Sequence, residues 1–336
     1  MEDISITLTT KPGASLKASV FSPPSPTTDN SLSDVLVVFL NGLVLSRRAW
    51  SPAITYLLSR YSNNNNQQPP TILTYDRYGQ GDSDNDPTDD PSALPYGHDA
   101  YQVVSDLHQL LTQFIASSSC LSNLNSTRLV FICSSIGCPL ARLYANAHAH
   151  QIQISAYLFL DSMIANTDFV SIFPDPDDPQ FDPDSLPADI SLQDLRYTRS
   201  QFYKFFHPTV PNAEHLDRRR LAEMLPFSDE PLLPLAAVPG SGSNDKKSPL
   251  LTVVGHDWDE FAEQCEKGTM TVPKRAINAF MNPAWASYND GLAHLIQPPE
   301  NQTPVKIATG CGHFIQKDDP EFVAREIKHL LDNLQG

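Results

Sequence analysis

The stretch RLVFICSSIGCPLARLYANA, residues 128–147, decides the fold that we expect for this chain. Its first six residues are almost all apolar, which is typical of a short strand buried on both faces. Residues 139–147 read as a helix that follows after a short turn. A strand that passes directly into a helix is the repeating unit of a mostly parallel α/β sheet, so the chain is predicted to contain such a sheet.

The turn between this strand and this helix contains CSSIGC, residues 133–138, with Ser135 near its centre. A sharp turn that lifts a serine hydroxyl above the edge of a sheet usually has the pattern G-x-S-x-G. Small residues on either side of the serine let the strand and the helix pack closely. Gly137 fits the second glycine of the pattern, and Cys133 replaces the first. This pattern makes Ser135 a candidate nucleophile, and an ordinary turn between strand and helix is the alternative that the pattern alone leaves open.

The same alternation of strands and helices continues along the chain. Further strands are predicted at residues 35–40, 71–75, 154–160, 250–254 and 304–308, and further helices at residues 100–114 and 320–334. Strands that alternate with helices predict the α/β fold class, here a mostly parallel sheet flanked by helices.

A long stretch between the fourth and fifth predicted strands has no clear strand pattern. It shows helical patterns at residues 192–206 and 213–225 instead. We expect an α/β core formed by residues 1–164 and 246–336, with residues 165–245 inserted as a helical cap. Stretches rich in Pro, Ser, Asn or Gly predict exposed loops at residues 22–33, 62–70 and 240–247.

Composition excludes several classes of function. Of the 336 residues, 40% are hydrophobic and 18% charged, as in an ordinary globular protein. A net charge of −16 argues against binding to nucleic acid, anionic membranes or strongly anionic substrates. The five irregularly spaced cysteines predict neither a disulfide framework nor a zinc site. The first residues lack the features of a signal peptide, and no apolar run is long enough to span a bilayer. We expect a cytoplasmic protein that uses no cofactor and no metal.

Several motifs, taken in order, resemble the α/β-hydrolase superfamily, and in particular its capped members with a serine nucleophile. They are NGL at residues 41–43, DRYGQGDS at 76–83, the serine turn at 133–138, CGHF at 311–314, and PE at 320–321. The resemblance runs from about Leu36 to Leu331. Two departures are Cys133 in place of glycine and Asn41 in place of the family's histidine.

The resemblance implies a role for each matching residue. His313 would be the base that takes the proton of Ser135, and the backbone N–H groups of Leu43 and Ile136 would form the oxyanion hole. The third member of the triad stays open between Asp161, which follows a predicted strand, and Asp257 in the loop after residues 250–254. Asp259 is a weaker candidate in that same loop. The usual position of the acid falls on Trp258, between these two aspartates.

The predicted function is hydrolysis of an ester, thioester or lactone of a small hydrophobic molecule through an acyl-serine intermediate. Transfer of the acyl group to another hydroxyl, or cyclisation, would use the same site. The aromatic residues of the predicted cap (Phe202, Tyr203, Phe205 and Phe206) favour a hydrophobic acyl substrate. Two alternatives are a catalytically silent protein of the same fold that binds a small molecule or a partner, and a cofactor-independent C–C bond hydrolase. Epoxide hydrolase and haloalkane dehalogenase chemistry is disfavoured, because those relatives need an aspartate at the position of Ser135.

Overall fold

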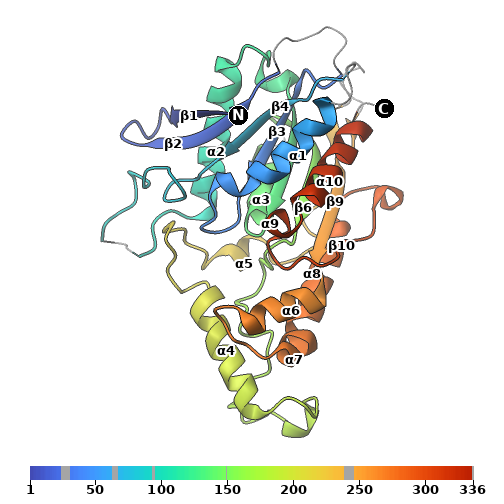
Figure 1. Cartoon of the computed structure of the whole chain (residues 1–336). Helices are drawn as coiled ribbons and strands as arrows, with labels where there is room; N and C mark the ends of the chain where they lie inside the picture. The colour runs from blue at the N-terminus through green and yellow to red at the C-terminus, as the bar shows by residue number, and fades with distance from the viewer. Residues whose placement is uncertain (24–30, 63–66, 93–94, 149, 238–245, 335–336) are drawn as a thin grey trace.

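The computed structural model describes residues 1–23, 31–62, 67–92, 95–148, 150–237 and 246–334. Within these residues, eight strands form one sheet in the order β1-β2-β4-β3-β5-β6-β9-β10 (Figure 1). β1 and β2 run antiparallel to their neighbours, and the other pairs are parallel. The strands of the sheet are β1 (Glu2–Thr7), β2 (Ser15–Phe21), β3 (Val35–Leu40), β4 (Thr71–Tyr75), β5 (Arg128–Ser134), β6 (Gln153–Leu160), β9 (Leu250–His256) and β10 (Lys306–Ala308).

Helices cover both faces of this sheet. The α-helices are α1 (Ser51–Ser62), α2 (Ala100–Ser117), α3 (Gly137–His148), α4 (Leu192–Phe206), α5 (Leu221–Met224), α6 (Trp258–Lys267), α7 (Lys274–Ala276), α8 (Asn282–Ala293), α9 (Ile315–Asp318) and α10 (Pro320–Asn333). Helices α2 and α3 belong to the apolar cluster on one face, and α1 and α10 to the cluster on the other. The predicted fold class, a mostly parallel sheet flanked by helices, is confirmed.

The central strand β5 shows why the two faces differ in their partners. Leu129 and Phe131 belong to the cluster that contains α2 and α3, while Val130 and Ile132 belong to the cluster with α1 and α10. All four side chains are fully buried. Because successive side chains of a strand point to opposite faces, a strand covered on both sides must be apolar at every position.

Some elements of the structure were not predicted from the sequence, and one predicted helix is absent in its expected length. The hairpin of β1 and β2 and the helices α1, α6 and α8 were not predicted. The helix predicted over residues 213–225 is wrong, because only Leu221–Met224 is helical. The Asn212 side chain accepts the backbone N–H groups of Glu214 and Leu216 at 3.1 and 3.2 Å. These local bonds hold the segment as a loop instead of a helix.

The segment between β6 and β9 contains α4, α5 and a pair of two-residue strands, β7 (Ala236–Ala237) and β8 (Lys246–Lys247). Figure 1 shows α4 beyond the end of the sheet, near α6 and α7. Parts of the three predicted loops, residues 24–30, 63–66 and 240–245, lie outside the described residues. None of the helices in the described ranges combines the length and the apolar character needed to cross a bilayer.

Candidate active site

Ser135 occupies the turn between β5 and α3. Its backbone has φ +53°, a left-handed conformation that is rare outside glycine. The Ser135 N–H donates to the Leu160 carbonyl of the next strand at 3.2 Å, which holds the turn in place. A Cβ on Gly137 would lie 2.3 Å from the Leu40 carbonyl oxygen, so α3 can start this close to β3 only with glycine at 137. Strain of this kind is common at functional turns.

His313 reaches Ser135 from the loop between β10 and α9. Its Nε2 atom lies 3.0 Å from the Ser135 Oγ atom. Two carboxylates hold the loop by its backbone: Asp257 accepts the N–H of Gly310 at 3.0 Å, and Asp318 accepts the N–H of Gly312 at 2.8 Å. The imidazole is therefore fixed beside the hydroxyl, as a general base requires.

Asp161 stands on the far side of the His313 imidazole. It follows β6 with φ +42°, and its N–H donates to the Val254 carbonyl at 2.7 Å. The fully buried carboxylate places Oδ2 2.6 Å from His313 Nδ1. The structure thus brings Ser135, His313 and Asp161 into one hydrogen-bonded chain.

Asp257, the other predicted acid, is not brought to His313. Its carboxylate caps the N-terminus of α6, where it accepts the N–H groups of Asp259 and Glu260 at 3.0 and 3.4 Å. Asp259 forms an ion pair with Lys274 at 3.2 Å on the surface. Asp257 therefore supports the start of α6 and, through the Gly310 N–H, the backbone of the His313 loop, while Asp259 joins α6 to Lys274 of α7.

A second imidazole contacts the Asp161 carboxylate. His256, the last residue of β9, has Nδ1 2.8 Å from Asp161 Oδ1, and its backbone N–H donates to the same oxygen at 3.2 Å. Burial alone would raise the pKa of Asp161, but the charge of His256 and the hydrogen bonds from both imidazoles lower it to about 2. Burial would lower the pKa of His256, yet the net shift is upward because of Asp161. The sequence analysis did not single out His256, although it ends a strand at the same sheet edge as Asp161.

The two predicted oxyanion donors lie on either side of Ser135. The Gly42 carbonyl accepts hydrogen bonds from Arg77 Nη2 at 3.0 Å and Gln80 Nε2 at 2.9 Å. Since C=O and N–H of a trans peptide point in opposite directions, the Leu43 N–H is directed away from these side chains. A Cβ on Gly42 would lie 3.3 Å from the Ser135 Cβ, so this loop adjoins the nucleophile.

Neither donor has a competing acceptor. Among the described residues, the N–H groups of Leu43 and Ile136 form no hydrogen bond. Ile136 follows the nucleophile directly and precedes the first residue of α3, where N–H groups lack partners within the helix. Both N–H groups are therefore free to bind an oxygen of a ligand.

Glu214, from the segment between β6 and β9, joins the loop that carries Leu43. Its buried carboxylate pairs with both Nε and Nη2 of Arg77, accepts Gln80 Nε2 at 2.9 Å, and accepts the N–H of Val44. Val44 has φ +53°, which is a genuine outlier for a β-branched residue. These contacts fix the loop after β3, and no local sequence signal predicted them.

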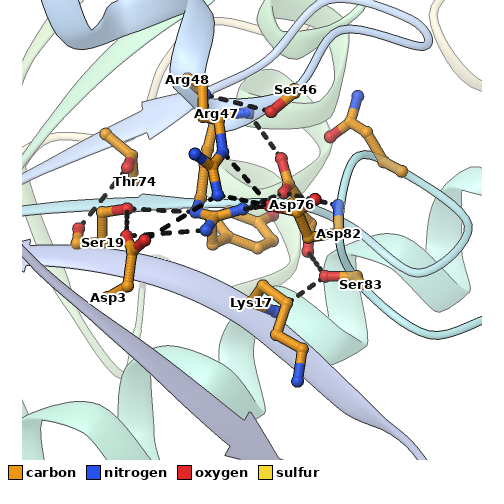
Figure 2. A network of polar contacts seen from close by, with 12 residues as sticks. Asp3, Lys17, Ser19, Ser46, Arg47, Arg48, Thr74, Asp76, Asp82 and Ser83 are labelled. Atoms are coloured by element: carbon orange, nitrogen blue, oxygen red, sulfur yellow. Dashed lines mark hydrogen bonds and ion pairs between the residues drawn. The ribbon is translucent and has the colours of Figure 1, made fainter.

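A second polar network, shown in Figure 2, ties the loop after β3 to the loop after β4. The Asp76 carboxylate accepts both the backbone N–H and the guanidinium of Arg47, each at 2.5 Å. It also accepts the N–H of Asp82 at 3.1 Å, and the Ser83 hydroxyl donates to the Asp76 carbonyl at 2.7 Å. The DRYGQGDS segment at 76–83 is thus a support for the neighbouring loop.

A cavity of about 220 Å³ lies beneath the segment that follows Asp161. Its apolar walls include Met163, Ile164, Phe169, Phe206 and Leu221. Ser135, Asp161 and His313 do not line it. Two aromatic rings connect it to the triad: Phe169 packs on Trp285 with ring centroids 5.9 Å apart, and Trp285 packs on His313 at 5.1 Å.

One group of described residues has the donor types of a metal site. Ligand atoms of Asp86, Asp89 and His98 lie within 4.8 Å of one another. The ammonium of Lys11 forms ion pairs with Asp86 and, at 2.7 Å, with Asp106. Since this ammonium already pairs with Asp86 and would repel a second cation, we assign no metal to the group.

Comparisons with known proteins place the chain in a family. A family model described as the alpha/beta hydrolase family matches residues 37–326. A search of curated proteins finds none that matches. Among solved structures, a thermophilic esterase from Thermogutta terrifontis is similar over 100% of both chains, with 14% identity and a TM-score of 0.54. Alpha/beta hydrolase domain-containing protein 10 from mouse is similar over 99% of this chain and 100% of that chain, with 13% identity and a TM-score of 0.51.

A variant of an epoxide hydrolase from Vigna radiata is similar over 99% of this chain and 98% of that chain, with 13% identity and a TM-score of 0.51. Similarity to solved structures at identities this low shows that the fold is shared. It gives no information about the substrate of this chain. The family model, by contrast, spans the sheet from β3 to α10 and includes every residue of the candidate site. This chain belongs to the alpha/beta hydrolase family.

Proposed function

We propose that this protein is a serine hydrolase that cleaves an ester, thioester or lactone of a small apolar molecule. The observation that carries the proposal is the continuous chain from Ser135 Oγ to His313 Nε2, at 3.0 Å, and from His313 Nδ1 to Asp161 Oδ2, at 2.6 Å. A nucleophile, a base and an acid that orients the base are the parts that acyl transfer through serine requires.

The geometry supports a two-step reaction. Ser135 Oγ attacks the acyl carbon while its proton moves to His313 Nε2, and the carbonyl oxygen becomes an oxyanion facing the N–H groups of Leu43 and Ile136. The intermediate collapses when His313 gives the proton to the leaving oxygen or sulfur. A water molecule then repeats the sequence on the acyl-serine, releases the acid and restores the hydroxyl.

The surroundings of the triad favour an apolar substrate. We propose that residues 165–245 act as a cap and that the cavity of about 220 Å³ receives an apolar part of the ester. This volume exceeds the roughly 150 Å³ of an apolar cavity that accepts benzene, so an aromatic or branched aliphatic group is a suitable size. The net charge of −16 disfavours anionic esters.

A fluorophosphonate probe, which reacts with activated serines, tests the mechanism. We expect labelling of the wild-type protein and none of Ser135→Ala. Ser134→Ala is the matched control, because Ser134 is the adjacent residue but its fully buried hydroxyl donates to Gln316 at 3.3 Å. Equal labelling of Ser135→Ala and the wild type would contradict the proposal. Absence of labelling in all three proteins would favour the catalytically silent alternative.

A series of p-nitrophenyl esters of increasing acyl length tests the substrate class. We expect kcat/KM to rise with acyl length or with an aromatic acyl group and then to fall once the cavity is full. Charged acyl groups such as succinyl should be poor substrates. A preference for acetyl over every larger group would exclude the cavity as a binding site for the acyl chain.

A further inference from the structure

We infer that His256 is a doubly protonated imidazolium paired with Asp161, and that it is a positioning residue which holds the Asp161 carboxylate toward His313. The catalytic part of this inference rests on the proposed function. The protonation state does not, because it follows from the hydrogen bonds around one buried side chain. His256 is only 3% exposed, so its partners are protein groups.

The contact with Asn282, which lies at the start of α8, determines whether Nε2 of His256 carries a proton. The Asn282 Nδ2 atom is 3.0 Å from the carbonyl oxygen of Trp258, which can only accept. The amide nitrogen must therefore face Trp258, and the amide oxygen faces His256 Nε2 at 3.0 Å. An oxygen of an amide accepts and does not donate, so Nε2 of His256 carries a proton.

The contact with Asp161 determines whether Nδ1 of His256 carries a proton. Nδ1 lies 2.8 Å from Oδ1 of this carboxylate, which also accepts the backbone N–H of His256. An ionised carboxylate has no proton to give, and the hydrogen bonds that Asp161 receives from the His256 backbone N–H and from His313 Nδ1 favour its ionised form. Nδ1 must therefore carry a proton as well. With both nitrogens protonated, the ring is positively charged.

The other groups around His256 allow this charge. Asp257 is the nearest further carboxylate and adds to the upward pKa shift. From α6, the ring of Phe261 packs at 4.3 Å between centroids, and from α8 the ring of Trp285 packs at 5.4 Å. Both rings are uncharged. Asp161 is thus the ionic partner of His256, and each offsets part of the cost of burying the other.

The pair has a consequence for the triad. With Oδ1 of Asp161 occupied by His256, the remaining oxygen is left to face His313 Nδ1. His256 thus fixes the orientation of the carboxylate that in turn orients the base. Loss of the ring donor at 256 should lower kcat and leave KM unchanged, because Asp161 is then less well aligned with His313.

The charge itself can be observed without any measurement of activity. Protein labelled with ¹⁵N at histidine gives two-bond ¹H–¹⁵N spectra in which both ring nitrogens of an imidazolium have similar shifts. We expect one histidine to keep the imidazolium pattern at pH 7.5, above the ordinary pKa of about 6.5, and its signals to be missing from His256→Gln. If the signal assigned to His256 shows a neutral tautomer at pH 7.5, the inference is wrong. His256→Asn serves for assignment should the Gln variant not fold.

The catalytic consequence is tested by the rate of fluorophosphonate labelling and by kcat and KM for an ester. In His256→Leu, which removes the ring donor to Asp161, we expect kcat to fall about tenfold at unchanged KM, and in His256→Gln, whose amide can still donate, we expect most of this loss to be recovered. His108→Gln, a half-buried histidine that packs on His148, should keep the wild-type kcat. A wild-type kcat in His256→Leu, or equal losses in His256→Leu and His256→Gln, overturns the positioning role. Failure of the wild type to react with the probe would instead contradict the proposed function, and the spectra would remain interpretable.

Discussion

Asp161 and Asp257 each follow a strand of the same sheet, but their carboxylates have different partners. Asp161 is fully buried between two imidazoles, whereas Asp257 accepts backbone N–H groups from α6 and from the loop that carries His313. Both residues are aspartates, and their contacts differ because the ends of β6 and β9 face different groups. A pair of isosteric substitutions therefore separates a role in proton transfer from a role in backbone support.

We predict that Asp161→Asn lowers kcat by several decades, on the order of 10⁴-fold, because an amide does not stabilise the protonated form of His313. Asp257→Asn should keep kcat within about tenfold, since asparagine caps a helix nearly as well as aspartate. Steady-state kinetics on a p-nitrophenyl ester measures both. Comparable losses in the two variants would show that Asp161 has no special part in the reaction.

At the scale of elements, the close approach of β3 and α3 sets the position of Ser135, the proposed nucleophile. A Cβ at residue 137 would lie 2.3 Å from the Leu40 carbonyl oxygen, and a backbone group cannot move aside as a flexible side chain can. We predict that Gly137→Ala lowers the free energy of unfolding by roughly 3 kcal/mol. Gly13→Ala is the control, since a Cβ there has nothing within 4 Å. Urea unfolding compares them, and equal stabilities would exclude the steric argument.

The loop after β3 is a second element whose support comes from far along the chain. Glu214 pairs with Arg77 and accepts the N–H of Val44, so it helps to fix the loop that carries the proposed oxyanion donor, the Leu43 N–H. We predict that Glu214→Gln lowers kcat about tenfold with little change in KM, a smaller loss than the 100- to 1000-fold that follows removal of an oxyanion donor.

The measurement is kcat, KM and the inhibition constant of a trifluoromethyl ketone, which forms a tetrahedral adduct with the serine. The affinity of this inhibitor should fall by the same factor as kcat/KM, because both depend on the oxyanion hole. Asp175→Asn is the control, since Asp175 forms an exposed ion pair with Arg199 at 2.9 Å. A raised KM at unchanged kcat would show that Glu214 affects substrate binding only.

At the scale of the whole molecule, Arg142 connects the core to the segment between β6 and β9. This buried residue of α3 donates to the carbonyls of Phe227 at 2.8 Å and Glu230 at 2.6 Å, and to the Tyr288 hydroxyl at 3.2 Å. We predict that Arg142→Met costs about 3 kcal/mol of unfolding free energy, because these buried acceptors lose charged donors.

The same variant should make the segment around residues 227–230 the first site of cleavage in limited proteolysis. Arg196→Met, at an exposed ion pair with Asp177, should leave both stability and the cleavage pattern unchanged. If the midpoint of urea unfolding of Arg142→Met equals that of the wild type, Arg142 does not anchor the segment between β6 and β9 to the core.

The fold could be predicted from the sequence largely because its central strands are short and apolar throughout. The surroundings of Ser135 and His313 could be anticipated from local patterns in the chain, a small residue at 137 and a Gly-His pair after a strand. The choice between Asp161 and Asp257 could not, because it depends on which strand ends face the His313 loop. His256 and Glu214 carry no local signal at all, since each acts through residues far away in the sequence.

The helix predicted over residues 213–225 failed for a related reason. Its apolar spacing is compatible with a helix, but the Asn212 side chain bonds nearby backbone N–H groups, and Arg218 donates to the carbonyls of Phe206, His207 and Val210. Side chains that satisfy the backbone in this way compete with helix formation. Such competition is decided by the packed environment and is not visible in periodicity.

The hydrogen bonds of the triad join residues that are 152 and 178 positions apart in the chain. A partly folded chain that lacks either the central strands or the last strand cannot bring Ser135, His313 and Asp161 together. Contacts between residues so far apart in sequence form late in folding, because they close large loops. During refolding from urea, the return of helical circular dichroism should therefore precede the return of serine reactivity. The reactivity of Ser135 would then report the moment at which the central strand β5 and the edge strand β10 have taken their places in the sheet.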